Sequence, residues 1–543
     1  MGTKSKQAKH ESGNKADDSL QAIHEKLDRL SSQNENLIKR LDKAVHERDE
    51  YRKLYELVHM ELDRLRRHVF GKRSERVAKE QLPLEFLQIA ESLKAFESED
   101  SPLPNSRRRN KEKKKRKPHG RKPLPEHLPL ERFEVPVPLE VQNNPDGYRK
   151  IGEDVSETLE WRAASMVRVQ IVRPKYSVKT DSKAMVLAPP LPTKPIEKGL
   201  AGPGLLSQVI VSKYADCLPL HRLEKIFSRQ KVDVARSTMC GWIARCSGLA
   251  LPVINAMKKD SLNAHCIATD ATGVKVQAPE KCIRAHFFVT IADRDHVIYH
   301  YARYHNGDFV KQMLGDFKGY ILADAHAVYD QLFIDEDKIE CACWSHARRY
   351  FHEALGTDPT RAMTAIPLIR KLFDIEHEQK DRPPDQKLLV RISDSKPVAD
   401  AFFDWCRLNE PLVIDDTPIQ KALTYAVNQE QPLRTYLGDG RLEMHNNFSE
   451  LQLRHQAVGR KNWIFLGSED GGEWNCVFTS LIASCKLHGI EPWAYIRDLL
   501  ILLPNWPEER ALELSPKYWL QTIQTEEVTN LLQQNPFWKI SSR

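Results

Sequence analysis

The stretch from Asn263 to Ala325 decides the fold, and it begins with the run HCIATDATGVKV from His265 to Val276. Its apolar and β-branched residues favour a buried strand over a helix, so the sequence predicts that Asp270 is a carboxylate on a sheet. Two more segments, Cys282 to Thr290 and His296 to Arg303, are rich in Val, Ile, Phe and Tyr and are joined by a short polar turn. Together they predict a three-stranded meander.

A second carboxylate lies at the end of a fourth strand. Asp308 to Phe317 has its apolar residues at helical spacing, and Tyr320 to Asp324 then returns as a strand. Two acidic residues on neighbouring strands form an oxygen-rich pair that suits Mg²⁺, which takes only one or two carboxylates from a protein. The alternative is an exposed aspartate at each strand end, and for Asp270 or Asp324 alone it is favoured.

The third acidic candidate is Glu450. The run from Asp439 to Glu450 leads from a turn into a helix that Asn446 or Asn447 can cap, which puts Glu450 in the first turn. A basic and aromatic segment, Gly459 to Ser468, follows immediately.

These motifs together resemble the DDE transposases of the insertion-sequence-66 family, from about Arg67 to about Trp519. The joint occurrence of five motifs in order is far more specific than any one of them. The matching residues are Asp270 with Thr272, Gly319 to Asp324, Cys343 to Arg349, Asn446-Asn447 with Glu450, and Gly459 to Trp463.

The resemblance implies a mixed α/β fold with a ribonuclease-H-like catalytic core in residues 262–502 and a helical insertion in residues 352–436. It implies that Asp270, Asp324 and Glu450 hold two Mg²⁺ (or Mn²⁺) ions for in-line phosphoryl transfer on DNA. The reaction would be cleavage at the element's ends followed by strand transfer into target DNA. Accessory proteins of the element could take part. Residues 503–543 are expected to be an appendage.

Composition sets the frame for this interpretation. A chain of 543 residues suggests three or four domains, and 41% hydrophobic residues suffice for globular cores. No run of 18 apolar residues occurs and the N-terminus is polar, so we expect no membrane span and an intracellular location, which the resemblance implies to be the bacterial cytoplasm. Ten scattered cysteines fit reduced thiols, and the net charge of +7 is a weak sign of a polyanionic partner.

A heptad pattern precedes these domains. Residues 1–19 are expected to be disordered and residues 20–80 to form a coiled coil, because apolar positions alternate at three-four spacing from Leu20 to Val69 over about seven heptads. At ~1.5 Å per residue the helix would span roughly 75 Å, which favours pairing with a second copy, a homodimer. Asn34 at an a position favours a parallel dimer, whereas Arg48 weakens the seam. A single amphipathic helix is the less favoured alternative.

Residues 81–118 are predicted to be a linker, and eleven Lys or Arg occur between Arg107 and Lys122. Such a run can hold phosphates, although a solvated tether is nearly as probable. Residues 119–192 are expected to form a small β domain with strands Glu157 to Pro174 and Lys183 to Ala188. The family has a zinc module here, but no cysteine occurs before Cys217 and Val178 and Asp181 stand where the second cysteine pair is expected. We therefore expect no zinc.

Residues 197–258 are predicted to form a helix-turn-helix. Leu205 to Ala215 and Pro219 to Arg229 are helical by period, and Ser237 is expected to cap a third helix, Thr238 to Cys246. A plain three-helix packing unit is the serious alternative. The candidate DNA contacts in this unit are Arg236, Ser237, Thr238 and Arg245.

Other residues are assigned by their place near the acids. Cys343 and His346 lie at a strand-helix junction and, with Asn446 and Asn447, are expected to be structural and close to the site. The further candidate DNA contacts are Arg348, Arg349, Arg454, Arg460 and Lys461.

Two alternative functions share these acids. A ribonuclease-H-like nuclease that cuts without joining would have little use for the dimer helix and the helix-turn-helix. A catalytically inactive DNA-binding relic is favoured by the absent zinc ligands and by three departures from the family pattern, His445, Ala271 and Leu451. None of these departures removes a metal ligand, so the active enzyme is preferred.

Overall fold

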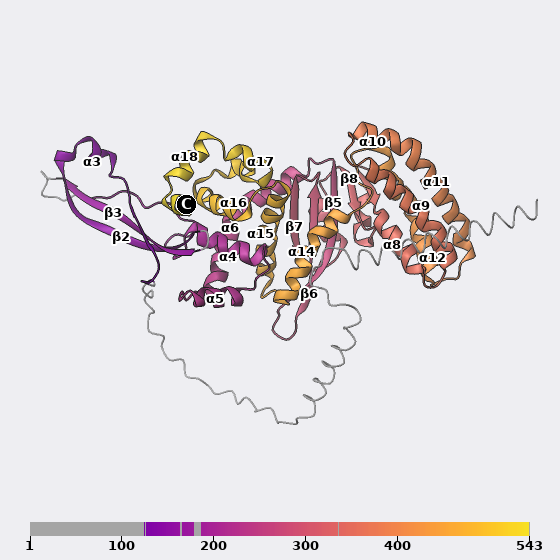
Figure 1. The fold of residues 1–543 in the computed structure, drawn as a ribbon, viewed down its shortest axis with the longest axis horizontal. Coiled ribbons are helices and arrows are strands. Elements are labelled where there is room, and N and C mark those ends of the chain that lie inside the picture. Colours follow the sequence, from indigo (N-terminus) through magenta and orange to yellow (C-terminus); the bar gives the residue numbers. More distant parts are fainter. Residues whose placement is uncertain (1–123, 125, 163–164, 179–185, 335, 542–543) are drawn as a thin grey trace, which may run out of the picture. The chain divides into compact units, whose positions relative to one another are not determined.

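The computed structural model describes residues 124, 126–162, 165–178, 186–334 and 336–541. The predicted coiled coil and the basic linker lie outside these residues. The described elements form two sheets and a large set of helices, so the fold is mixed α/β (Figure 1).

The first sheet is built on a long hairpin (Figure 1). Strands β2 (Tyr148–Arg162) and β3 (Ser165–Val178) pair antiparallel along their length, and β1 (Leu130–Glu134) and β4 (Val186–Leu187) pair with β3. The ranges Glu157 to Pro174 and Lys183 to Ala188, which were expected to supply strands, contain parts of β2 and β3 and the short strand β4. The short helix α3 (Leu139–Asn143) and the 3-10 turn η1 (Pro145–Gly147) connect β1 to β2.

Three helices follow, α4 (Pro203–Tyr214), α5 (Leu220–Arg229) and α6 (Arg236–Ser261). The first two confirm the prediction. The third differs, because α6 begins at Arg236, extends to Ser261 and has no side-chain cap. Ser237 therefore lies inside the helix, and the buried apolar residues Ala250, Val253 and Met257 continue its buried face far beyond the expected end at Cys246.

A five-stranded sheet forms the centre of the chain. Its order is β7-β6-β5-β8-β9, in which β5 (Cys266–Val276), β6 (Ile283–Ala292) and β7 (His296–Ala302) are antiparallel. Strands β8 (Gly319–Ala323) and β9 (Lys338–Ala342) run parallel to β5. The predicted meander and the return strand are confirmed.

Different elements cover the two faces of this sheet. Helix α14 (Asn447–Trp463) and helix α15 (Glu469–Leu487) pack their apolar residues against the face that carries Val289 and Tyr299. Helix α7 (Gly307–Leu314) and the 3-10 segment η2 (Ala327–Ile334) cover the opposite face, which carries Ile267 and Phe288. Residues that alternate along β5 therefore point into different cores.

A helical insertion stands between β9 and α14 (orange in Figure 1). Trp344, at its start, is fully buried against Phe402 and Phe403, with ring centroids 5.3 and 5.7 Å away. Its elements are α8 (Trp344–Ala354), α9 (Pro359–Glu378), α10 (Pro384–Val390), the π-helix η3 (Arg391–Ser395), α11 (Lys396–Asn409), η4 (Glu410–Leu412), α12 (Pro418–Asn428), α13 (Glu430–Arg434) and η5 (Thr435–Gly438).

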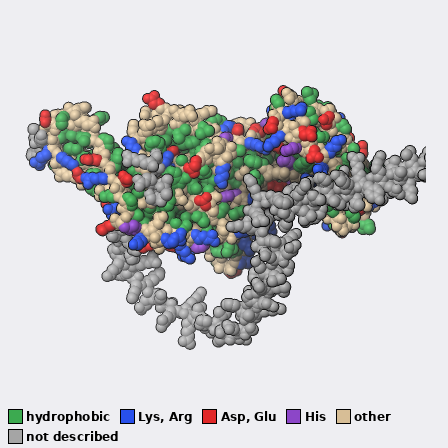
Figure 2. Space-filling view, in the orientation of Figure 1, with side chains coloured by type: hydrophobic (Ala, Val, Ile, Leu, Met, Phe, Trp, Pro, Cys, Tyr) green, Lys and Arg blue, Asp and Glu red, His purple; other side chains and the backbone are tan. Residues whose placement is uncertain are grey.

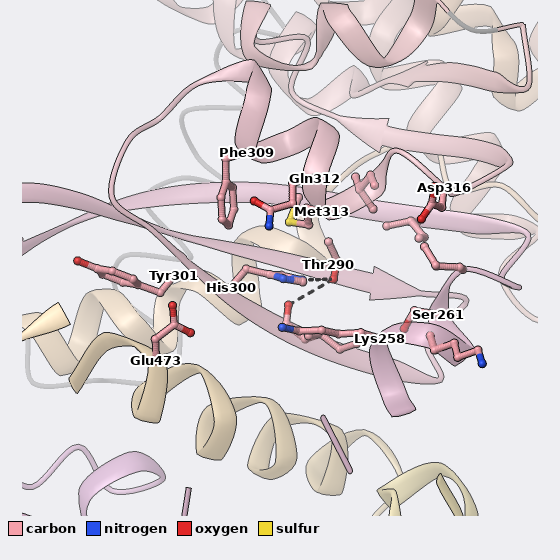
Figure 3. Close-up of a pocket in the computed structure, with 15 residues that line it drawn as sticks. Lys258, Ser261, Thr290, His300, Tyr301, Phe309, Gln312, Met313, Asp316 and Glu473 are labelled. Carbon is pink, nitrogen blue, oxygen red and sulfur yellow. Dashed lines mark hydrogen bonds between the residues drawn. The ribbon is translucent and has the colours of Figure 1, made fainter. Parts of the chain in front are cut away.

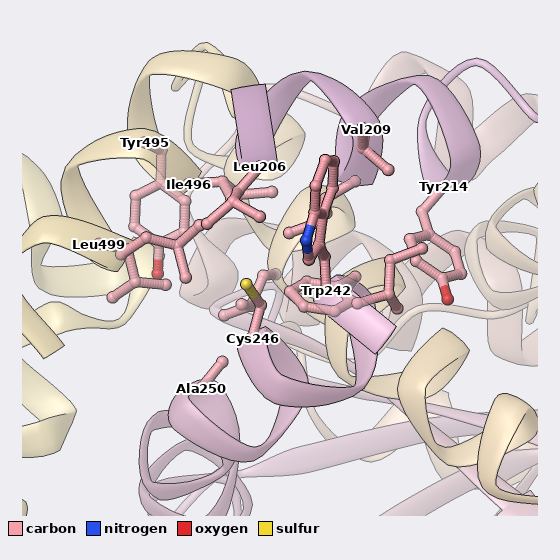
Figure 4. Close-up of a cluster of buried hydrophobic side chains, with 14 of the residues drawn as sticks. Leu206, Val209, Tyr214, Trp242, Cys246, Ala250, Tyr495, Ile496 and Leu499 are labelled. Atoms are coloured by element: carbon pink, nitrogen blue, oxygen red, sulfur yellow. The ribbon is translucent and has the colours of Figure 1, made fainter. Parts of the chain in front are cut away.

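The C-terminal helices pack into the largest core. Figure 4 shows Leu206 of α4, Trp242 of α6 and Tyr495 of α16 (Pro492–Leu502) meeting in one apolar cluster. Residues 503–541, expected as an appendage, are part of this core through Leu514 and Trp519. Their elements are η6 (Leu503–Asn505), η7 (Glu508–Leu514), α17 (Pro516–Thr522), α18 (Glu526–Gln534) and α19 (Pro536–Ser541).

A buried carboxylate joins the first sheet to the helices. Glu160 of β2 is fully buried, and its Oε1 accepts hydrogen bonds from the backbone N–H groups of Trp161 and Leu205, both at 2.7 Å. Leu205 lies in the first turn of α4, so a side chain from another element caps this helix. Burial raises the pKa of Glu160 to about 8, against the opposing effects of these hydrogen bonds and of the charge on Arg497.

Candidate functional site

Asp270 and Asp324 come together through the register of two neighbouring parallel strands. Ala268 of β5 pairs with Leu322 of β8. Two residues further along each strand come Asp270 and Asp324, so both lie on the same face as that pair, side by side. Asp324 directly follows β8, and its Oδ1 accepts a hydrogen bond from the His326 N–H at 3.2 Å. The structure thus brings these two predicted acids together.

Glu450 approaches the pair from α14. It lies in the first turn of that helix, as predicted, and its Oε1 is 3.6 Å from Nε2 of His346 on α8. Burial, with the negative charges of Asp324 and Glu450, raises the pKa of Asp270 to about 7, against the lowering effects of the Ala271 N–H and Arg349. These interactions place all three carboxylates within electrostatic reach of one another.

The three acids do not form a complete metal-binding site in this arrangement. Within the described ranges, no three His, Cys, Asp or Glu side chains stand close enough together to hold an ion. The Glu450 side chain is 45% exposed, so it has room to change rotamer. Asp270 and Asp324 are fixed by the sheet.

Asn446 ties the segment before α14 to the sheet. Its Nδ2 donates to the Thr269 carbonyl at 2.7 Å, and its backbone N–H donates to Sγ of Cys343 at 3.1 Å. The predicted side-chain cap is wrong, because Asn446 occupies the N-cap position of α14 without a capping hydrogen bond. The Asn446 side chain instead donates its hydrogen bond to the Thr269 carbonyl of β5, and this bond fixes α14 to the strand that bears Asp270.

Cys343 and His346 also lie close to the acids. Cys343 is fully buried at the start of α8, and the Trp344 N–H beside it donates to the Met444 carbonyl at 3.0 Å. Burial lowers the pKa of His346, and its Nδ1 has no hydrogen-bond partner among the described residues. Asn447, by contrast, is exposed at the first position of α14.

The helical insertion braces the segment that leads to Glu450. Arg391 of the π-helix is 2% exposed and donates to the backbone carbonyls of Tyr436 (2.9 Å), Asp439 (2.6 Å) and Leu442 (2.8 Å). Gly440 lies so close to Pro384 that an added Cβ would stand 1.8 Å from its carbonyl oxygen. No sequence pattern signalled either contact.

The basic candidates differ in their surroundings. Arg454 and Lys461 of α14 are exposed, whereas Arg460 is half-buried and its guanidinium donates to the Gly273 carbonyl. The structure therefore gives Arg460 a partner inside the protein. Arg348 lies over the Phe373 ring, 5.8 Å from its centroid, and Arg349 lies near enough to Asp270 to lower its pKa.

The other candidates lie on α6. Arg236, Ser237, Thr238 and Arg245 are all exposed. Basic side chains also gather over the neighbouring helix α5 and the turn after it (Figure 2). The exposed members of this surface are Arg222, Lys225, Arg229 and Lys231.

A histidine cluster beside Asp324 was missed by sequence reasoning. The ring of His305 is 4.9 Å from that of His286 and 4.8 Å from that of His326, and it stacks on Phe288 at 5.2 Å. Burial lowers the pKa of His286 to about 4 and also lowers that of His305. The three histidines come from three separate segments, so no local spacing could have found them.

Two cavities flank the sheet. One of about 440 Å³ is lined by Ala268, Leu322 and Asn446 and lies on the face that carries Asp270. The other, of about 320 Å³, lies on the opposite face beneath α7. There the Thr290 hydroxyl and Nε2 of His300 are 3.0 Å apart (Figure 3). None of the three acids lines either cavity, but the first is lined by Ala268 and Leu322, two residues before Asp270 and Asp324.

Comparison with known proteins identifies the family of the chain. Residues 198–474 match the family described as "Transposase IS66 family", and this range contains all three acids. The chain belongs to the IS66 family of transposases. Residues 480–516 of the transposase match the "IS66 C-terminal element", and residues 58–132 match "Transposase C of IS166 homeodomain". The predicted family is confirmed, and the chain is an insertion-sequence transposase.

Relatives of the transposase occur in Sinorhizobium fredii. It is 26% identical over 489 residues to the uncharacterized protein y4hP, covering 85% of this chain and 88% of the relative. It is 29% identical over 478 residues to the uncharacterized protein y4qI, covering 83% and 87%. None of the helices in the described part of the transposase is long and apolar enough to cross a membrane.

Proposed function

We propose that the transposase binds the ends of its element and catalyses metal-dependent DNA strand cleavage and strand transfer, with Asp270, Asp324 and Glu450 as the catalytic acids. The observation that carries this proposal is the register of β5 and β8, which sets two aspartates side by side. The effect of Asp324 and Glu450 on the pKa of Asp270 supports a shared site.

The central sheet and its insertion are proposed to be a ribonuclease-H-like core. The strand order β7-β6-β5-β8-β9 supports this, because it puts Asp270 on β5 and Asp324 directly after the neighbouring strand β8. Helix α14 then lies over the face on which both aspartates stand. The helical insertion belongs to the same core, since Arg391 fixes the segment before the third acid.

The donor chemistry of the three acids fits Mg²⁺ or Mn²⁺. Carboxylate oxygens are the ligands that these cations prefer, and the repulsion that raises the Asp270 pKa is the kind that a divalent cation relieves. Asp270 and Asp324 would hold the ion, with the Glu450 side chain completing the set after a change of rotamer. When bound, the cation supplies charge neutralisation at the phosphate and lowers the pKa of the attacking hydroxyl.

The chain's own residues position the DNA for this reaction. The oxygen of water attacks the phosphorus in the cleavage step and a 3′-hydroxyl attacks in the joining step. In both, the attacking oxygen gives up its proton to solvent as the new P–O bond forms, the opposite P–O bond breaks, and the leaving oxygen takes a proton from solvent. Arg349 lies near enough to Asp270 to affect its pKa, and its side chain is 56% exposed with its Nε 3.9 Å from Glu353, so it can hold a phosphate oxygen. The sheet fixes the two aspartates against which the phosphate lies.

DNA binding is proposed to use the basic surfaces outside the acids. The exposed residues of α5 and the start of α6 suit the phosphates of the element ends, and Arg454 and Lys461 suit DNA near the reacting strand. The heptads of Leu20 to Val69 are proposed to join two copies. The sheet of β1 to β4 is proposed to be a metal-free counterpart of the family's zinc module.

The three departures from the family pattern leave the acids in place. His445 stacks on Phe373, with ring centroids 5.8 Å apart and planes 12° from parallel. The Ala271 backbone N–H donates to Oδ1 of Asp270 at 2.7 Å, a contact that any residue except proline makes. Leu451 is 54% exposed. These surroundings favour the active enzyme over the inactive relic.

A cleavage and joining assay on a supercoiled donor plasmid that carries the element's ends tests the proposal. Asp270→Asn, Asp324→Asn and Glu450→Gln should each abolish strand cleavage in Mg²⁺ and leave duplex binding mostly intact. Glu443→Gln is the matched control, because Glu443 lies seven residues before Glu450 and pairs with Arg294 at 3.0 Å. Full cleavage by Glu450→Gln would reject Glu450 as the third acid. Cleavage by the parent without joining would favour the nuclease.

A further inference from the structure

A strained turn ends the helix that carries Glu450. Ile464 has φ 66° and ψ −51°, and the Phe465 N–H donates to the Trp463 carbonyl at 2.7 Å. This is a γ-turn with positive φ, a conformation that is rare for any residue and unfavourable for a β-branched one. Such strain persists only where the surrounding structure or a function maintains it.

Both flanks of the turn are firmly anchored. The Ile464 N–H donates to the Arg460 carbonyl at 2.8 Å. On the other side, the Leu466 N–H donates to the Lys275 carbonyl and its carbonyl accepts from the Gln277 N–H, both at 2.8 Å. Leu466 itself is buried. The backbone is therefore forced through the γ-turn between α14 and the edge of β5.

The side chains at this turn are exposed although they are apolar. Ile464 is 66% exposed and Phe465 is 40% exposed. Burial of Ile464 therefore cannot be what offsets the strain of its backbone. A β-branched residue held rigidly outward in this way is suited to contact a partner.

The turn also completes a stripe along α14. Four exposed positions of α14 recur three or four residues apart, which puts them on one face of the helix, and Phe465 follows just beyond its end. Apolar and basic residues alternate along the stripe, which consists of Leu451, Arg454, Val458, Lys461 and Phe465. At ~1.5 Å per residue it runs roughly 21 Å from the first turn of α14 to Ile464, about six base pairs of duplex.

The charge of this stripe favours DNA as its partner. Lys275 is exposed on the neighbouring strand and adds to Arg454 and Lys461. The nearest following acid, Glu469, is paired with Arg303 at 3.3 Å. Basic residues with apolar side chains between them match a phosphate backbone with sugars and base faces between the phosphates.

From these observations we infer that Ile464 and Phe465 form a wedge that enters a base step of the bound DNA about six base pairs from the reacting phosphate. Arg454 and Lys461 hold the phosphates along the way. Rigid apolar side chains inserted in this manner unstack bases and bend the duplex. The inference rests on the proposed function, because it assigns DNA to the surface beside Glu450.

The test uses the full chain in EDTA and a duplex with the sequence of the element's terminal repeat, in which 2-aminopurine replaces one base at a time. Unstacking raises the fluorescence of this base. We expect the parent to give a several-fold rise at one or two adjacent positions. Ile464→Asn and Phe465→Ala should abolish the rise while anisotropy shows an affinity within about tenfold of the parent, because the phosphate contacts remain.

Ile414→Asn is the matched control, since Ile414 is an isoleucine with 79% exposure in the helical insertion, and it should keep the full rise. A rise in Ile464→Asn equal to the parent's would overturn the wedge. So would a change of oligomeric state in light scattering, which would assign the stripe to a second copy.

The wedge and the proposed function fail separately. A parent that cuts the supercoiled donor but leaves every base stacked contradicts the wedge alone. A parent that binds no duplex contradicts both.

Discussion

Arg391 and Glu376 form a two-pronged ion pair inside the helical insertion, Nε to Oε1 at 2.8 Å and Nη2 to Oε2 at 2.7 Å. The pair orients a guanidinium whose other N–H groups hold three backbone carbonyls of the segment before α14. This segment carries Asn446, which is bonded to the strand of Asp270. The insertion thus helps to set the distance between the third acid and the first two.

Arg391→Met should destabilise the protein by about 3–5 kcal/mol, because it leaves the Glu376 carboxylate and the carbonyls without their donor. Thermal and urea unfolding measure the change. Arg370→Met is the control, since Arg370 forms an exposed pair with Asp374 on the same helix as Glu376, and its loss should cost at most about 0.5 kcal/mol. Equal effects of the two substitutions would contradict the bracing role of Arg391.

The stability of the chain should fall between about pH 4.5 and pH 8 through Glu160. Its pKa is about 8 in the folded protein against an ordinary value of 4.5. A raised pKa means that the stabilising contribution is complete below pH 4.5 and is lost as the pH rises through 8. Glu160→Gln keeps an acceptor for the Leu205 N–H and cannot ionise. Its thermal midpoint should exceed the parent's increasingly from pH 5 to pH 8, and a constant difference would reject this assignment.

Mg²⁺ should stabilise the parent more than it stabilises Asp270→Asn. Without a cation, stability is lost through Asp270 as the pH rises from its ordinary pKa of 3.8 through its folded pKa of about 7, since burial and two neighbouring acids oppose its charge. At pH 8 the Asn variant should therefore have the higher thermal midpoint without Mg²⁺. Titration with MgCl₂ should raise the parent's midpoint further than the variant's. An equal rise in both would argue against Asp270 as a ligand.

Deletion of residues 1–70 should reduce the oligomeric state. The segment holds the heptads from Leu20 to Val69, whose apolar seam needs a partner helix. Light scattering of the full chain and of the deletion variant measures this. If the oligomeric state is unchanged by the deletion, the dimer contact must lie in another part of the transposase.

The central sheet and its two aspartates could be predicted because their signals are local. The residue pattern of β5 and the short turn between β6 and β7 together predict a meander. In that turn, Asp293 and Arg294 both have positive φ. Neither signal depends on the rest of the chain. The first turn of α14 was equally readable from its sequence. Such patterns depend on the period of one element, and tertiary contacts leave them unchanged.

The errors arose where a distant group overrode a local preference. Asparagine is a favoured residue at the N-cap of a helix, yet the Asn446 side chain donates to the Thr269 carbonyl instead of capping α14. Ser237 was expected to start a helix that starts earlier, because Met239 and Trp242 bury a face that continues through α6. Arg391 and Glu160 act on segments remote in sequence, so neither could be found from spacing.

The packing of the C-terminal helices means that the first sheet cannot be fully covered until the end of the chain has been synthesised. Phe537 of α19 is buried against Val167 and Val169 of the first sheet, and the Asn535 amide donates to the Thr193 carbonyl, 342 residues earlier. A ribosome makes that sheet long before it makes α19, so the growing chain exposes an apolar strand face through most of translation. Nascent copies are consequently open to chaperones and proteases until α19 emerges, and a frameshift anywhere upstream leaves that face uncovered.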